Sequence, residues 1–89
     1  MKIIKADLDG IILIEPDVFS DKRGLFCESF SLRKYREVGI DCEFVQDNFS
    51  ISEGNIIRGL HYQIQPVAQA KLVSVIEGEI YDVAVDLRK

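Results

Sequence analysis

Short apolar runs, each ended by turn residues, follow one another along almost the whole of the 89-residue chain. Runs of this kind are typical of β-strands joined by turns, and several in succession indicate an antiparallel sandwich or barrel. Only residues 32–38 have the pattern of a helix. The sequence therefore predicts an all-β, antiparallel fold with one short helix, in a single domain over residues 1–89.

The clearest of these patterns lies in the last third of the chain. From Lys71 to Val75, every second residue lies on one face of an extended segment, because side chains alternate across a strand. A turn follows at 77–79, and alternate residues of 81–87 are then apolar. The pattern predicts a hairpin whose two apolar faces match, with Lys71 at the start of the inward stripe.

Local signals place the remaining elements. Ser31 is a suitable N-cap for the helix, and Gly39 is a suitable stop. Pro16 ends the first apolar run. Further strands are expected at 11–14, 25–30 and 44–51, and turns at 19–24 and 52–55.

Composition limits the classes of function. Apolar residues make up 47% of the chain and charged residues 29%, with a net charge of −4 at pH 7. This balance is that of a globular protein, and it argues against a nucleic-acid-binding or anionic-membrane surface, which needs a basic patch. No signal peptide or membrane span is recognisable, so we expect a cytoplasmic protein with Cys27 and Cys42 as reduced thiols.

The sole histidine lies in the sequence Arg58-Gly59-Leu60-His61-Tyr62-Gln63. Histidine suits proton transfer near neutral pH, and two cations such as Arg58 and Lys71 suit an anion that is bound or forming. The alternative is a histidine packed in the core, and the local sequence leaves both open. A metal site of the type that needs several imidazole ligands is not expected from a single His.

These residues belong to a longer series of motifs. In chain order the series is Phe19-Ser-Asp21-Lys-Arg23-Gly24-Leu-Phe26-Cys-Glu28, Phe44-Val45-Gln46-Asp47-Asn48, Arg58-Gly-Leu-His61-Tyr-Gln63, Ala68-Gln69-Ala70-Lys71-Leu72-Val73 and Gly78-Glu-Ile-Tyr-Asp82-Val-Ala-Val-Asp86-Leu-Arg88. With this order and spacing, the chain resembles the first half of the dTDP-4-dehydrorhamnose 3,5-epimerase family from about Ile14 to Arg88. Two local departures are Phe49, where that family usually has His, and Ala70, where it usually has Gly.

The resemblance implies a cupin-like jelly roll, present here in truncated form, and a reaction that uses no cofactor. In that reaction protons are removed and returned beside the ketone of dTDP-4-dehydro-6-deoxyglucose, towards dTDP-rhamnose. His61 matches the family's base, and Lys71 matches the residue that stabilises the enolate oxygen. A strand would place Arg58 and His61 on opposite faces, so a bulge at Gly59 is expected to turn both inward.

The resemblance also implies the substrate contacts. Arg58 matches a substrate-binding arginine that stabilises charge, and Gln46 and Asn48 match polar contacts to the dTDP-4-keto-6-deoxyhexose. A nucleotide-contacting segment lies near the neighbouring subunit's site in the family's homodimers. Its matching residues here are Phe19, Arg23, Phe26 and Glu28.

The family's chains are roughly double this length, and two of their catalytic residues come from the second half. These are the tyrosine that acts as the acid and the aspartate that orients the histidine, and no residue here matches either. Three hypotheses therefore stay open: an epimerase, a truncated and inactive sugar-nucleotide-binding homologue, or one piece of a split epimerase. Half a jelly roll is also expected to leave open sheet edges and an uncovered apolar face.

Overall fold

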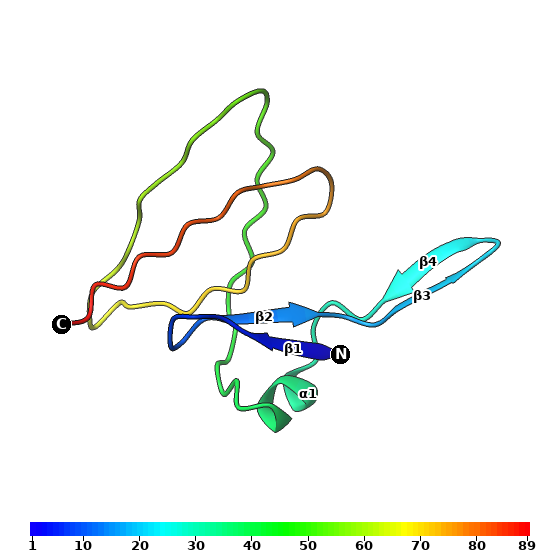
Figure 1. Cartoon of the computed structure of the whole chain (residues 1–89), viewed down its shortest axis with the longest axis horizontal. Coiled ribbons are helices and arrows are strands. Elements are labelled where there is room, and N and C mark those ends of the chain that lie inside the picture. The colour runs from blue at the N-terminus through cyan, green and yellow to red at the C-terminus, as the bar shows by residue number, and fades with distance from the viewer. The chain divides into compact units, whose positions relative to one another are not determined.

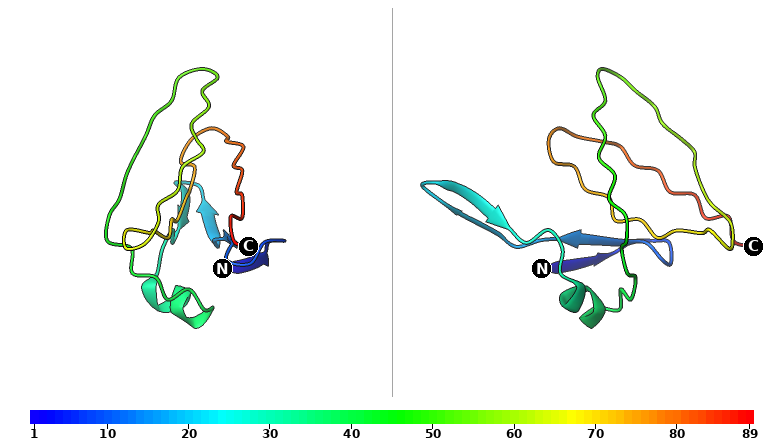
Figure 2. Two further views of the ribbon diagram at one scale, coloured as in Figure 1. Left: turned by 90° about the vertical axis from the view of Figure 1, so that its left-hand side faces the viewer. Right: turned by 180° about the vertical axis from the view of Figure 1, so that it is seen from behind.

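The computed structural model describes all residues from 1 to 89 and divides the chain into two compact units. Unit 1 comprises Met1–Asp41 with Tyr81–Lys89, and unit 2 comprises Cys42–Ile80. Four strands and one short helix follow one another in unit 1 (Figures 1 and 2). The antiparallel strands and the single short helix expected from the sequence are thus present, in two small sheets.

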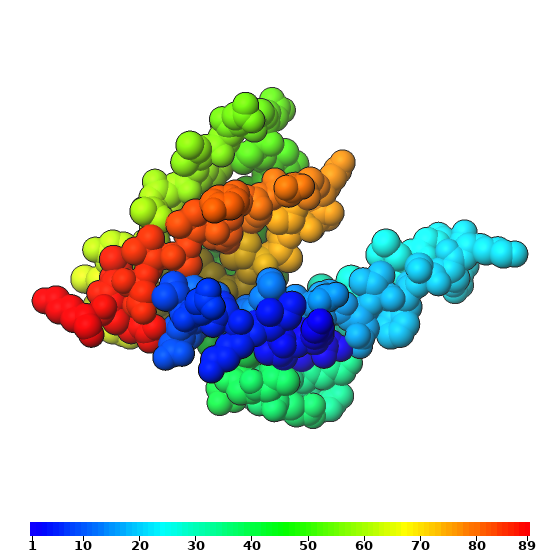
Figure 3. Space-filling model, viewed as in Figure 1, coloured from blue at the N-terminus to red at the C-terminus, as the bar shows by residue number.

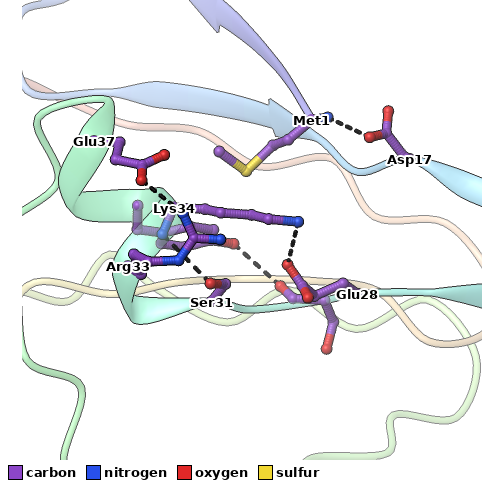
Figure 4. A network of polar contacts seen from close by, with 9 residues as sticks. Met1, Asp17, Glu28, Ser31, Arg33, Lys34 and Glu37 are labelled. Atoms are coloured by element: carbon purple, nitrogen blue, oxygen red, sulfur yellow. Dashed lines mark hydrogen bonds and ion pairs between the residues drawn. The ribbon is translucent and has the colours of Figure 1, made fainter.

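Strands β1 (Lys2–Lys5) and β2 (Ile12–Glu15) pair antiparallel, with Ile3 opposite Ile14. The α-amino group of Met1 forms an ion pair with Asp17 at 2.6 Å (Figure 4). Its hydrogen bond and its charge hold the pKa of Asp17 below the usual range. The expected strand at 11–14 is confirmed by β2, whereas β1 was not expected, because lysines flank its isoleucines.

Strands β3 (Val18–Asp21) and β4 (Gly24–Cys27) form the second antiparallel hairpin, which appears as a narrow projection, light blue to cyan, in Figure 3. The expectation of a turn over 19–24 is wrong in extent, because the turn occupies only residues 22–23. The Asp21 carboxylate accepts a hydrogen bond from the backbone N–H of Arg23 at 2.8 Å. This contact closes a short turn and lets the preceding residues remain in a strand.

Helix α1 (Leu32–Glu37) begins at the predicted residue and ends one residue before the predicted end at Val38. The Ser31 hydroxyl accepts a hydrogen bond from the backbone N–H of Lys34 at 3.4 Å, and Gly39 follows the helix with a φ of 91°. Tyr35 packs edge-on against Phe30, with ring centroids 4.8 Å apart, and its hydroxyl donates to the Ser29 carbonyl at 3.1 Å. With only 4% of its surface exposed, Tyr35 is the one buried hydrophobic residue, and burial raises its pKa.

Replacing Tyr35 with Ala is therefore expected to melt α1. Truncating a buried aromatic side chain costs about 3 kcal/mol or more, which exceeds what a helix of six residues retains without packing. Far-UV circular dichroism and amide exchange over residues 32–37 measure the loss. Tyr35→Phe is the matched control, since it removes only the hydroxyl bond and should cost about 1 kcal/mol. Equal effects of the two variants would contradict a packing role.

Unit 2 (Cys42–Ile80) contains turns and bends but no helix or strand. Bends lie at 54–55 and 76–78, close to the expected turns. The strands expected at 44–51 and 71–75 are absent, as is the strand expected at 81–87 in unit 1, so the predicted hairpin is wrong in this structure. An extended segment becomes a strand only when a neighbour pairs with its backbone groups, and no such neighbour is bonded here.

The apolar side chains of unit 2 consequently remain exposed. Ile57 is 98% exposed and Val45 is 89% exposed, and every residue from 45 to 80 is in the exposed class. No helix in the structure has the length and apolar character needed to cross a membrane.

Arg88 ties the C-terminal segment of unit 1 to the connection between β1 and β2. Its guanidinium donates to both carboxylate oxygens of Asp86, at 2.9 and 2.8 Å, and to the backbone carbonyl of Asp9 at 2.8 Å. A cavity of about 320 Å³ lies beside this contact, between residues 8–11 and 84–88. Hydrogen bonds from the Arg88 side chain, and then from its backbone, lower the pKa of Asp86 to about 2.

A carbon-detected NMR titration should therefore find Asp86 titrating at about 2 rather than at the usual 3.8. Because the folded pKa is the lower one, the contact stabilises fully above 3.8, and this contribution is lost as the pH falls through 2. Arg88→Ala should restore an ordinary pKa, whereas Arg33→Ala, on the helix, should leave Asp86 unchanged. A wild-type Asp86 that titrates near 3.8 would refute the contact.

Candidate functional site

The three residues with the strongest chemical signal, Arg58, His61 and Lys71, all lie in unit 2. Each is exposed and stands on backbone outside any strand or helix. The structure records no hydrogen bond or ion pair that joins one of them to another. The three groups are thus accessible to a ligand, and the close approach expected from the sequence stays a prediction.

Arg58 is the member of this set with a defined partner. Its Nε and Nη2 atoms donate to the Ser52 hydroxyl at 3.2 and 3.1 Å. The two residues flank the bend at 54–55, so that bend brings a serine and an arginine together. The acceptor of both hydrogen bonds is thus an uncharged hydroxyl rather than a carboxylate.

Gly59 separates Arg58 from His61 and has a φ of 139°, which side chains with a Cβ rarely adopt. The chain therefore departs from regular extended geometry where a bulge was expected. A β-bulge in the strict sense is not formed, because no strand pairs with this segment.

Gln46 and Asn48 point the same way. The Gln46 side-chain amide donates to the Asn48 side-chain carbonyl at 3.1 Å. Two residues apart on extended backbone, they share a face, as alternation requires. The pair presents further amide donors and acceptors to solvent, which is suitable chemistry for hydroxyl groups of a sugar.

A second group of candidate residues lies on the β3–β4 hairpin of unit 1. Phe19 and Phe26 are directly opposite in the strand register and are 64% and 69% exposed. Together with Arg23 they line a groove of about 250 Å³. Exposed aromatic rings beside a guanidinium form a surface on which a base can stack while a phosphate is bound.

Asp21 also lines this groove, although it is not among the site residues predicted from the sequence. Its carboxylate pairs with the Arg23 guanidinium at 2.6 Å. The side-chain hydrogen bonds lower the pKa of Asp21 and raise that of Arg23. The sequence does contain a signal for this contact: Asp21 lies two residues before Arg23, and this spacing favours a local contact across a turn.

Glu28 does not join the groove. Its carboxylate forms an ion pair with the Lys34 ammonium at 2.9 Å, on the side of the helix (Figure 4). A nucleotide contact of Glu28 would require this pair to open, and pairs at an exposed position open at little cost.

Over residues 1–89, no three His, Cys, Asp or Glu side chains gather as a ligand set.

Comparison with known proteins gives one consistent result. The family model described as dTDP-4-dehydrorhamnose 3,5-epimerase matches residues 5–89. The chain is similar to the protein of that name from Shigella flexneri, with 51% identity over 100% of this chain and 50% of the relative. It is also similar to that of Methanothermobacter thermautotrophicus, with 53% identity over 99% of this chain and 47% of the relative. The chain thus spans about half the length of these curated relatives, and no solved structure matches it.

Proposed function

The chain belongs to the dTDP-4-dehydrorhamnose 3,5-epimerase family, and on that basis we propose that it is the N-terminal part of a nucleotide-sugar epimerase. The substrate is dTDP-4-dehydro-6-deoxyglucose, and the product leads towards dTDP-rhamnose. The observation that carries the proposal is the family match over residues 5–89, the range in which Arg58, His61 and Lys71 lie.

In the proposed reaction, the neutral His61 imidazole removes the proton from a carbon beside the ketone. The electron pair of the broken C–H bond moves into the adjacent C–C bond, and negative charge develops on the ketone oxygen. The Lys71 ammonium stabilises this oxygen as a compact cation, and Arg58 binds the anionic part of the substrate. Such charge stabilisation by one group contributes about 10²–10³-fold in rate.

The remaining residues bind the substrate in this proposal. The amide pair of Gln46 and Asn48 contacts sugar hydroxyls. Phe19 and Phe26 stack with the nucleotide base, and Arg23 binds a phosphate. The ion pair between Arg23 and Asp21 is exposed to solvent, so exchanging the carboxylate for a phosphate costs little.

The assembled enzyme is proposed to be a cytoplasmic homodimer with a cupin-like jelly roll and to work without a cofactor. The exposed apolar surface of unit 2 supports the jelly roll, because the second sheet of a complete sandwich would cover that surface. Arg23, Arg33 and Arg88 are each paired with a carboxylate, which argues against a basic surface for nucleic acid.

A second candidate is a truncated, inactive homologue that only binds the sugar nucleotide, or one piece of a split epimerase. None of these 89 residues matches the family's acid or its orienting aspartate, and the chain spans about half the length of its curated relatives. The deciding experiment incubates the chain with a dTDP-4-keto-6-deoxyhexose in heavy water. Exchange beside the ketone supports the epimerase chemistry, and complete inertness supports the binding homologue.

A further inference from the structure

Four arginine side chains of this protein differ in the group that accepts their hydrogen bonds. Arg23, Arg33 and Arg88 pair with Asp21, Glu37 and Asp86, at 2.6, 2.7 and 2.8 Å. Arg58 instead donates twice to the hydroxyl of Ser52, at 3.2 and 3.1 Å, and has no carboxylate partner. A carboxylate fixes a guanidinium but cancels its charge, whereas a hydroxyl fixes it and leaves the charge in place.

The geometry of the contact divides the guanidinium into a held edge and an open one. Ser52 accepts from Nε and Nη2, which form one edge of the planar group. The Nη1 donors on the far side are left to an external acceptor. A planar fork with one edge fixed and the other open is suited to an anionic oxygen of a ligand.

We propose that Ser52 is a positioning residue, which orients Arg58 for the anionic part of a nucleoside diphosphate sugar without neutralising it. This inference rests on the proposed function for its ligand, but not for the contact itself. Ser52 precedes the bend at 54–55 and Arg58 follows it, so the orientation is built into one local segment. The proposal requires that the group accepting hydrogen bonds from Arg58 is uncharged.

The test uses the complete chain and dTDP as the probe, titrated calorimetrically into four proteins besides wild type. Ser52→Ala should weaken binding about threefold to tenfold, the usual scale for one hydrogen bond. Ser52→Thr, which keeps the hydroxyl, should bind as wild type does. Ser52→Asp should hold Arg58 firmly and yet bind more weakly than Ser52→Ala, because it cancels the charge.

The control is Ser50→Ala, which removes a nearby hydroxyl that forms no hydrogen bond in the structure. It should leave binding unchanged. Ser52→Asp binding as well as wild type would overturn the requirement for a neutral acceptor, and equal losses in Ser50→Ala and Ser52→Ala would overturn a specific role of Ser52.

A second measurement separates this inference from the proposed function. Nitrogen-15 relaxation of the Arg58 Nε–H group reports its order without any ligand. The group should be ordered in wild type and in Ser52→Thr, and mobile in Ser52→Ala. Equal mobility in all three would overturn the positioning role. Ordered Arg58 in a wild-type protein that does not bind dTDP would leave the positioning role standing and overturn the proposed ligand.

Discussion

The purified 89-residue chain is expected to associate rather than to sediment as a compact monomer of 10.1 kDa. A folded monomer of this mass exposes about 5,300 Å². The chain exposes 9056 Å², an excess of about 3,800 Å². One partner in a standard interface buries only about 800 Å², so the excess corresponds to extensive association.

The apolar residues of unit 2 are the expected source of this association. Their side chains lie on extended backbone whose hydrogen-bonding groups have no strand neighbour, and both features favour pairing with another chain. Ile57→Asp should therefore reduce the mass observed by sedimentation. Glu79→Gln, which changes an exposed polar residue of the same unit, should not.

A monomer of 10.1 kDa that melts in one cooperative transition would contradict this expectation. It would mean that the segments of unit 2 find partners within a single chain. Calorimetry and sedimentation on the same sample give both observations.

Proton exchange without inversion is the second large effect expected. In the proposed mechanism, His61 and Lys71 are the two groups that form an enolate from one face of the sugar. Without an acid on the opposite face, the proton returns to the side it left, and the configuration is kept. Exchange should be slow, because a base without its orienting carboxylate loses much of its efficiency.

Two variants assign this exchange to the proposed groups. His61→Ala should abolish deuterium uptake, because no other base is proposed to reach the carbon. Lys71→Ala should slow it about 10²–10³-fold, the scale for losing one oxyanion stabiliser. Lys5→Ala, which removes an exposed lysine of β1, is the matched control and should exchange at the wild-type rate.

Elements with local causes could be predicted from the sequence. Ser31 and Gly39 mark the ends of α1, and Tyr35 packs against Phe30 only five residues away. Strands β2 and β4 pair with strands that precede them closely in the sequence, so the strands predicted there are formed. Strand β3 was missed because Asp21 closes its turn through a side-chain contact that alternation does not reveal.

The strands predicted in the second half of the chain need pairing partners that are distant in the sequence, and these strands are not formed. The alternation from Lys71 predicts which residues share a face, but it does not supply the backbone that must pair with them. The same limit applies to the site. The motif identified Arg58, His61 and Lys71, yet their mutual geometry depends on a sheet that this structure does not form. The Ser52–Arg58 contact is local and is formed.

The most direct test of the epimerase chemistry is proton NMR of a dTDP-4-keto-6-deoxyhexose incubated with the wild-type chain in heavy water. The account predicts slow loss of the signal from a carbon beside the ketone, with the ring couplings of the remaining substrate unchanged. Rapid inversion at either carbon would contradict it, because an acid on the opposite face would then be present within these 89 residues.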